Sequence, residues 1–402
     1  MARETVSLDS VRTSLADVVA ACDELGAQLL GHLMAENPGA NVLVCPLGLA
    51  LVLALVADGA TDAATQGYDR LLGAGGLGRD RAWSAVQTAL GRYDRSLDGF
   101  DPGKPPETPL VHVANHVVVV DRKDLTVSQT YLDTVLRWFS AQIEKVPLGD
   151  LADNLSKWAD KNTAGLIKKT GVQVTGDTAL VLQNALLFAA RWSRPFEAEG
   201  TAEDTFTRAD GSATRAQFMH DTRTVPYARG RDWAAVRLDY QDGQGGGRPG
   251  GQGLAIDVVL PRRRTSPTDL PPATWAQASA ALDQAAAGSD QNEVKIVLPK
   301  LDLTSGPVEL LEMLKALGLD TSSLDGIALG LSISQVVQQV RLLVDEEGTV
   351  AAALTEVGLT AGAAPDQSKP IDFVVDHPYV LRLRDLATGT TLVQAAIMGP
   401  AA

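Results

Sequence analysis

Residues 345–365 read DEEGTVAAALTEVGLTAGAAP, a long run of small and β-compatible side chains between strands expected at 336–344 and 371–375. A connection of this length is unusual in a compact domain. The odd positions from 349 to 359 are all small or uncharged, and the only charge of that stretch, Glu356, lies among the even positions. This alternation suits a strand with one buried face. We therefore expect a loop that can become a strand, with Gly348 supplying backbone freedom at its start.

The chain around this loop mixes helices and strands without a regular alternation. The apolar stretches at 110–120 and 180–188 are typical of central strands. No internal repeat or break in composition divides the sequence, so we expect one α+β domain over residues 1–402. Spacings of three and four predict helices at 11–29, 46–58, 61–72, 80–97, 128–139 and 150–170. Shorter strands are expected at 205–207, 214–219, 225–228, 234–238 and 254–260.

Bulk composition excludes several classes of function. The net charge of -14 argues against binding nucleic acid or an anionic membrane, both of which need a basic face. No apolar stretch is long enough to span a bilayer. The first residues lack a secretory leader, which indicates a cytoplasmic protein, or an extracellular one whose leader has been removed. Cys22 and Cys45 lie in apolar runs and are expected to be buried free thiols.

Nothing in the sequence supports catalysis by this chain. His112 and His116 are four residues apart, but in a strand that spacing spans about 13 Å, too far for one metal ion. Sequence motifs of zinc proteases, serine hydrolases and dithiol enzymes are missing. We therefore expect no enzyme activity, no metal site and no cofactor.

Several short motifs occur in the order found in one known family, the serpins. The hinge segment EEGTVAAA at 346–353 is the most specific of them. The others are NVLVCPLG at 41–48, GATDAATQ at 59–66, WADKNTAGLI at 158–167, NALLFAARWSRPF at 184–196, LPK at 298–300, LKALG at 314–318 and DHPY at 376–379. Each is weak alone, and 59–66 is one position out of register. Together they cover nearly the whole chain, which therefore resembles a serpin, of a bacterial type.

The resemblance implies a fold of three β-sheets with eight or nine helices and an exposed reactive-centre loop at about 346–369. It also implies a suicide inhibitor of serine proteases, which we expect to act as a monomer. The protease cleaves the loop, forms an acyl-enzyme and is trapped when the loop inserts into the large sheet. Counting from the hinge glycine places the reactive bond between Gly362 and Ala363. Small residues there suit an elastase-like or subtilisin-like protease, and the first basic residue beyond them is Lys369.

The resemblance also assigns structural roles. The hinge comprises Glu346, Glu347, Gly348, Thr349, Val350, Ala351, Ala352 and Ala353, and the positions where the sheet opens are Cys45, Asn184, Trp192, Lys300 and Gln338. A pair between Glu346 and Lys300 is a hypothesis, and Trp192 also suits plain core packing.

Three positions depart from the family pattern at the gate of the sheet. Cys45 and Gly48 replace serines, and Gln338 replaces a histidine. Because a thiol is a poor donor, either Gln338 and Asn184 rebuild the hydrogen bonds or the gate works differently. The altered gate, Leu354 and the Gly362–Ala363 bait favour an alternative function, that of a non-inhibitory serpin acting as a binding or structural protein.

Overall fold

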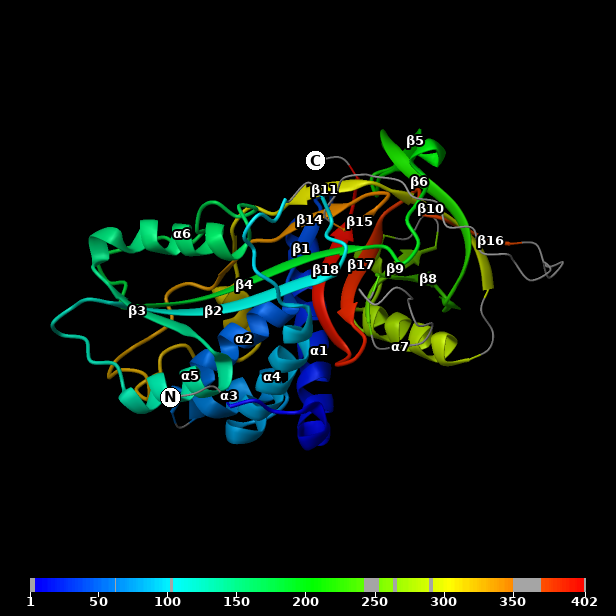
Figure 1. Ribbon diagram of the computed structural model, residues 1–402. Helices are drawn as coiled ribbons and strands as arrows, with labels where there is room; N and C mark the ends of the chain where they lie inside the picture. Colours follow the sequence, from blue (N-terminus) through cyan, green and yellow to red (C-terminus); the bar gives the residue numbers. More distant parts are fainter. Residues whose placement is uncertain are drawn as a thin grey trace.

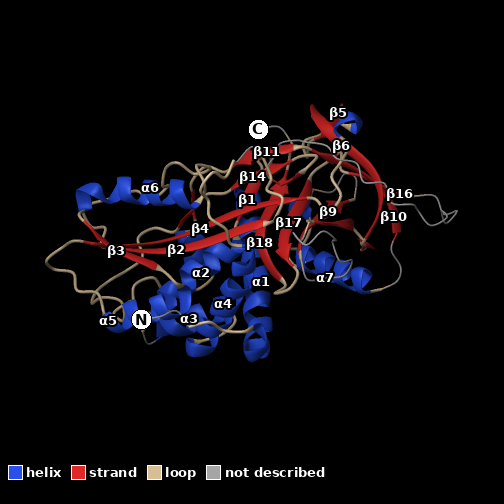
Figure 2. Ribbon diagram, viewed as in Figure 1, coloured by secondary structure: helices blue, strands red, loops and turns tan. Residues whose placement is uncertain are grey.

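The computed structural model describes residues 4–61, 63–101, 104–241, 253–262, 266–288, 292–349 and 370–400. Within them, helices and strands form an α+β fold in which most helices gather on one side of the strands (Figures 1 and 2). The helices are α1 (Arg12–Glu36), α2 (Pro46–Ala57), α3 (Ala63–Leu72), α4 (Gly76–Leu90), α5 (Gln129–Phe139), α6 (Leu151–Asn162), α7 (Thr274–Ala287) and α8 (Leu311–Ala316).

The sheet that matters for function, here called the large sheet, has six strands. Its order is β11 (Leu301–Thr304), β14 (Arg341–Val344), β15 (Gly348–Thr349), β4 (Leu180–Arg191), β2 (Leu110–Val120) and β3 (Gln142–Val146). The long pair β2 and β4 is antiparallel, whereas β3 runs parallel to β2. One face of the sheet packs on α2, and α6 lies along the other (Figure 1).

A second six-stranded sheet, here called the core sheet, is antiparallel throughout. Its order is β1 (Val42–Val44), β18 (Thr390–Ile397), β17 (Tyr379–Asp385), β9 (Leu254–Pro261), β8 (Trp233–Asp239) and β7 (Tyr227–Arg229). Every residue of β9, β17 and β18 is buried. Such continuous burial needs near-continuous apolar sequence, and the run LAIDVVL in β9 interrupts it with a single charge, Asp257.

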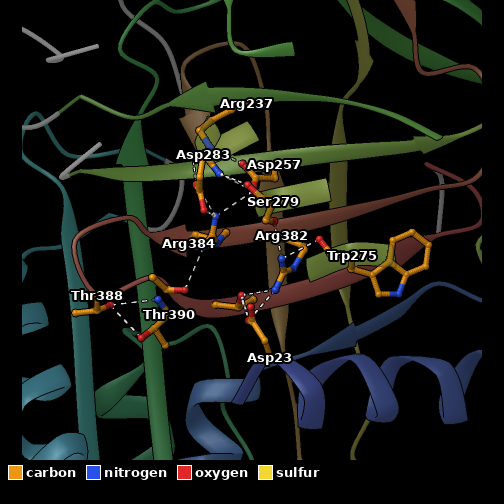
Figure 3. Close-up of polar contacts among 12 residues, drawn as sticks. Asp23, Arg237, Asp257, Trp275, Ser279, Asp283, Arg382, Arg384, Thr388 and Thr390 are labelled. Atoms are coloured by element: carbon orange, nitrogen blue, oxygen red, sulfur yellow. Dashed lines mark hydrogen bonds and ion pairs between the residues drawn. The ribbon is translucent and has the colours of Figure 1, made fainter. Parts of the chain in front are cut away.

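Buried charges in the core sheet compensate one another (Figure 3). Arg237 of β8 donates to both carboxylate oxygens of Asp257, at 2.6 and 3.0 Å. Asp283 of α7 accepts from Arg237 at 2.7 Å and from Arg384 of β17 at 3.2 Å. Burial alone would raise the pKa of Asp257, but the two guanidinium groups hold it below its ordinary value. The network therefore ties α7 to three neighbouring strands.

A third sheet and a short pair complete the described strands. The third sheet has the order β16 (Ile371–Val374), β10 (Asn292–Pro299), β6 (Ala213–Val225) and β5 (Ala202–Thr207), and the pair joins β12 (Val308–Glu309) to β13 (Val337–Gln338). Within the described ranges, none of the helices has the length and apolar character needed to cross a membrane.

Four sequence expectations need correction. The helix expected at 80–97 is α4, which begins at Gly76 and ends at Leu90 before a 3-10 turn. The helix expected at 150–170 ends at Asn162, because Ala164 and Gly165 take left-handed conformations with φ of 49° and 80°.

The other two corrections concern strands. The strand expected at 336–344 is divided into β13 and β14, since Val340 leaves the ladder to bond with Ser305. The strand expected at 214–219 is longer and continues to Val225 as β6. The strand expected at 225–228 is the short β7, which begins at Tyr227.

Candidate functional site

The start of the long loop folds back on the strand before it. Asp345 caps this turn, because its side chain accepts from the backbone N–H groups of Glu347 and Gly348 at 3.0 and 3.2 Å. The backbone N–H of Asp345 donates in turn to the carbonyl of Gly348 at 3.0 Å. The turn brings β15 back antiparallel to β14 and places it between β14 and β4. The first residues after the turn are therefore already part of the large sheet.

Gly348 is required here by close approach of two backbones. A Cβ at this position would lie 2.1 Å from the carbonyl oxygen of Ala190 and 2.8 Å from the Cα of Arg191, both in β4. Backbone atoms cannot yield as a flexible side chain can, so a larger residue would push β15 away from β4. The sequence suggested conformational freedom as the role of this glycine, and the structure adds a packing role.

Thr349 turns its side chain into the core beneath the sheet. Only 2% of the residue is exposed, and its Oγ1 lies 2.6 Å from the hydroxyl of Tyr240. The Tyr240 ring stacks on Trp192, with centroids 4.6 Å apart and planes 12° apart. The indole N–H of Trp192 donates to the carbonyl of Asp345 at 2.8 Å. The aromatic pair thus provides a seat for the first inward-facing residue of the hinge.

A charged pair closes the top of the same turn. Lys300 Nζ lies 2.6 Å from Glu346 Oε2, and Thr201 donates to the other carboxylate oxygen at 2.7 Å. Partial burial would raise the pKa of Glu346, but the bonds from Lys300 and Thr201 hold it below its ordinary value. Since the Lys300 side chain is 38% exposed, this pair contributes no more than about 1 kcal/mol. Its structural effect is to fix the direction in which the chain enters the sheet.

Below Thr349 the large sheet has an opening. Within the described residues, β4 and β14 are joined only through the two residues of β15. A cavity of about 560 Å³ continues from there between β4 and the 336–343 segment. Apolar side chains of α2 line one end, among them Leu49, Val52 and Leu53, and Trp158 of α6 lines the other. The cavity therefore extends from one face of the sheet to the other.

The polar residues at the gate make two sets of hydrogen bonds. Gln338 accepts from the backbone N–H of Cys45 at 2.8 Å and donates to the Cys45 carbonyl at 2.9 Å. Asn184 donates to the Ala114 carbonyl at 3.2 Å and to the side chain of Asn115 at 2.9 Å. Because Cys45 begins α2, which packs against β4, the bonds of Gln338 tie the 336–343 segment to the helix beneath the opening.

The two serine replacements fit this arrangement. Cys45 Sγ accepts from the backbone N–H of Gly48 at 3.4 Å, and burial raises the pKa of the thiol to about 12. A Cβ at Gly48 would lie 2.7 Å from Asn184 Oδ1 and 3.0 Å from Cys45 Sγ. The Cys45 sulfur, which is larger than a serine oxygen, therefore fits because Gly48 has no side chain. Both cysteines are free and buried, as the sequence indicated.

The structure brings Trp192, Lys300, Glu346, Glu347, Gly348 and Thr349 together at the top of the opening, and Cys45, Asn184 and Gln338 further down. Val350 to Ala353 and the bait residues Gly362 and Ala363 lie outside the described residues. His112 and His116 lie in a strand, as expected. In the part of the chain that the structure describes, no group of three or more potential metal ligands gathers.

Sequence reasoning missed Tyr240 and Asn115. Tyr240 follows β8, far from the hinge in the chain, and reaches it only because an isolated bridge joins Trp192 to Tyr240. Asn115 lies opposite Asn184 in the β2–β4 register. A polar residue in the middle of an apolar strand was the available signal for Asn115, whereas none pointed to Tyr240.

Comparison with known proteins agrees with this geometry. A family model described as serpin (serine protease inhibitor) matches residues 20–400. The chain therefore belongs to the serpin family. Its members in general target serine proteases and act as suicide substrates more often than as catalysts, and a mobile loop with a conformational change is a general feature of the family.

Three individual likenesses illustrate the match. An uncharacterized serpin-like protein of Thermococcus kodakarensis is 25% identical over 370 residues, covering 90% of this chain and 81% of the relative. The structure of the thermophilic serpin tengpin in its native state has a TM-score of 0.75 at 20% identity, covering 99% of this chain and 96% of tengpin. Human thyroxine-binding globulin has a TM-score of 0.79 at 16% identity, covering 97% and 100%. The two structures share the fold with this chain.

Proposed function

We propose that this chain inhibits serine proteases by suicide cleavage of the loop that follows Thr349. The observation that carries the proposal is the opening in the large sheet, which Gly348 and Thr349 have already begun to fill. A strand continuing from Thr349 would enter the space between β4 and the 336–343 segment. The inward positions after Thr349 are small or uncharged, so they suit burial there.

The chemistry divides between the two proteins. The protease serine would attack the carbonyl of Gly362, forming an ester with it, while the bond to Ala363 breaks and Ala363 leaves with a free amino group. This chain supplies the substrate loop and the opening, and we propose no catalytic activity of its own. Insertion of the freed loop adds main-chain hydrogen bonds, each contributing about 1 kcal/mol, and buries apolar surface. That gain would hold the ester-linked protease in a distorted state.

The proposed target has a small specificity pocket, as in elastase-like or subtilisin-like proteases. Gly362 and Ala363 are small, and no lysine or arginine occurs between Thr349 and Lys369. A trypsin-like pocket, which requires a basic residue before the scissile bond, would find none near the bait. We further propose that the protein acts as a monomer and without nucleic acid or cofactor.

A non-inhibitory role is the second candidate, and the altered gate favours it. Among the described residues, Gln338 bonds to Cys45 and Asn184 bonds to Ala114 and Asn115, so these two side chains share no direct hydrogen bond across the opening. A serpin whose sheet opening is not closed by such a bond could serve a binding or structural role. In that role the loop would remain on the surface and would not insert into the sheet.

A denaturing gel separates the two candidates. The protein is mixed with an elastase-like and with a subtilisin-like protease, and with each protease after its active-site serine has been blocked. We expect a covalent, detergent-stable complex with at least one active protease and none with the blocked ones. Cleavage of the loop without a complex would favour the non-inhibitory role. If cleavage also left the thermal stability unchanged, loop insertion itself would be refuted.

A further inference from the structure

Helix α6 and the segment after it form a cover across the opening. The helix lies over β2, β3 and β4 (Figure 1), and the residues that follow it, 163–178, continue along the cavity. At the far side, Gln335 accepts from the backbone N–H of Gln173 at 2.9 Å and donates to its carbonyl at 2.7 Å. The segment after α6 thus bonds directly to the far wall of the opening. A strand that fills the cavity must displace part of this cover.

At the near side, the cover rests on one buried histidine. His116 of β2 has no exposed surface, and its ring stacks on Trp158 of α6 with centroids 4.9 Å apart and planes 18° apart. Its Nδ1 lies 3.3 Å from Gln183 Oε1 in β4. The other ring nitrogen, Nε2, lies 3.5 Å from Glu144 Oε2 in β3 and has no hydrogen-bond partner among the described atoms.

Neighbouring polar contacts hold α6 on the same patch of sheet. The indole N–H of Trp158 donates to Gln142 Oε1 at 3.2 Å, and Asn154 donates to Glu144 Oε2 at 2.8 Å. Hydrogen bonds, first of all the one from Asn154, hold the pKa of Glu144 below its ordinary value, so this carboxylate stays charged in mild acid. His116 is therefore the group in this patch whose ordinary pKa lies closest to neutral pH.

The charge state of His116 depends on whether α6 covers it. Burial lowers the pKa of His116 when α6 is in place, and the hydrogen bond that His116 donates to Gln183 and the charge of Glu144 only partly oppose this. With α6 lifted, the imidazole would be solvated and its pKa would be near the ordinary value of about 6.5. A proton therefore binds the lifted state more tightly. The stability of the seated helix is complete above that value and falls as the pH drops below it.

We propose that His116 makes the seating of α6 sensitive to pH, so that mild acid loosens the cover and speeds strand insertion into the opening. The pH-dependent loosening of α6 is inferred from the contacts of His116 alone. Its effect on strand insertion depends on the proposed function. One proton is linked to the change, so the ratio of lifted to seated helix rises by at most about tenfold for each pH unit.

Other charged groups surround α6. The charged residues of the helix that face solvent are Asp153, Lys157, Asp160 and Lys161. On β2 itself, His112 lies four residues before His116 on the same face, with Nδ1 2.8 Å from Asp94 Oδ1 and Nε2 3.1 Å from Asn162 Oδ1 at the end of α6. His112 therefore contacts the end of the helix, whereas His116 lies beneath its middle.

Hydrogen exchange of the uncleaved protein tests the structural step without a protease. Amide exchange over 151–162 is measured at pH 7.5, 6.5 and 5.5 in the wild type, H116F and H116Q. The phenylalanine keeps a ring against Trp158 without a proton site. Comparing wild type with variant at each pH cancels the intrinsic pH dependence of exchange. H220Q, which removes a histidine that bonds to Gly200 away from α6, is the matched control.

We expect protection of α6 in the wild type and H220Q to fall by up to about tenfold per pH unit below 6.5, relative to H116F and H116Q. Equal pH dependence in the wild type and both His116 variants would overturn the proposal.

A second measurement addresses insertion. The loop is cleaved at pH 7.5 and at pH 5.5 with a protease that cuts it without trapping, and the gain in thermal stability is followed over time. The gain should appear faster in acid for the wild type and at a pH-independent rate for H116F. If no gain appears at any pH, the proposed function fails while the exchange result still decides the role of His116. If the gain appears at the same rate at both pH values, the link from the cover to insertion is overturned.

Discussion

The two six-stranded sheets of this protein are built in opposite ways. The core sheet is a continuous antiparallel ladder with β9, β17 and β18 buried throughout, and its internal charges are paired. The large sheet has two walls joined at the top by the two residues of β15, with a cavity of about 560 Å³ below. The difference teaches that stability is distributed unevenly. The core sheet is the rigid part of the fold, whereas the large sheet has space for an additional strand.

The contrast also separates two kinds of polar contact. In the core sheet, Arg237 and Asp257 bond across neighbouring strands, so separating those strands would leave buried charges unpaired. In the large sheet, Gln338 bonds to Cys45 at the start of α2 and Asn184 bonds to β2, so no direct bond joins the two side chains across the opening. Resistance to opening then comes from the bonds to α2, from the cover and from the contacts of the hinge.

The largest effect is expected from Thr349→Arg, at the one inward hinge position that the structure describes. The residue is 2% exposed and faces the hydroxyl of Tyr240. An arginine there would bury an unpaired charge, which costs several kcal/mol and prevents β15 from staying in the sheet. We expect the covalent complex with protease to disappear while cleavage of the loop continues, measured by denaturing gel.

Thr349→Val is the matched control, because valine has a similar shape without charge. It should lose the bond to Tyr240 and still form the complex. A covalent complex with Thr349→Arg would mean that odd hinge positions do not turn inward during insertion.

The next largest effect is expected in the core sheet, from Asp257→Ala. Among the described residues, the substitution leaves Asp283 as the remaining carboxylate that bonds to the buried Arg237, and it should lower the free energy of unfolding by about 3–5 kcal/mol. Urea denaturation at pH 7 measures this loss. Glu203→Ala, which breaks an exposed pair with Arg215, should change stability by less than about 1 kcal/mol. Similar losses in the two variants would contradict the view of the core sheet as the rigid part of the fold.

These two predictions draw on different amounts of sequence information. The alternation in residues 349–359 predicted an inward Thr349 before the structure was known, because strand faces follow a period of two. Pairing of Glu346 with Lys300 was a hypothesis from the family resemblance, and the two side chains do lie 2.6 Å apart. The partners of Thr349 and Asp257 depended on how distant strands meet, which neither periodicity nor composition records. The bait at Gly362–Ala363 stays a prediction.

The gate shows most clearly where sequence reasoning ended. Replacement of a histidine by Gln338 and of serines by Cys45 and Gly48 left two outcomes open, a rebuilt network or a different gate. The choice depends on distances of tenths of an ångström, such as the 2.7 Å between a Cβ at Gly48 and Asn184 Oδ1. Such distances come from packing of α2 against β4 and are not encoded in any local pattern.

A smaller effect is expected from Gln338→Ala on the wall of the opening. The variant loses both bonds to the backbone of Cys45, which should lower the free energy of unfolding of the uncleaved protein by about 1–3 kcal/mol. Gln339→Ala is the control, because within the described ranges no hydrogen bond of the Gln339 side chain is found. Urea denaturation of both variants checks the prediction. Equal stability would show that the gate bonds do not hold this wall in place.

The smallest effect is expected from Tyr240→Phe, which tests the seat of the hinge. The ring can still stack on Trp192, so only the bond to Thr349 is lost, at a cost of about 1 kcal/mol. Hydrogen exchange over 341–349 should become a few times faster, while the covalent complex still forms. Tyr379→Phe is the matched control, since the buried Tyr379 hydroxyl has no partner among the described atoms, and its removal should leave exchange unchanged. If Tyr240→Phe behaves like Tyr379→Phe, Thr349 is held by the backbone pairing of β15 with β4 alone.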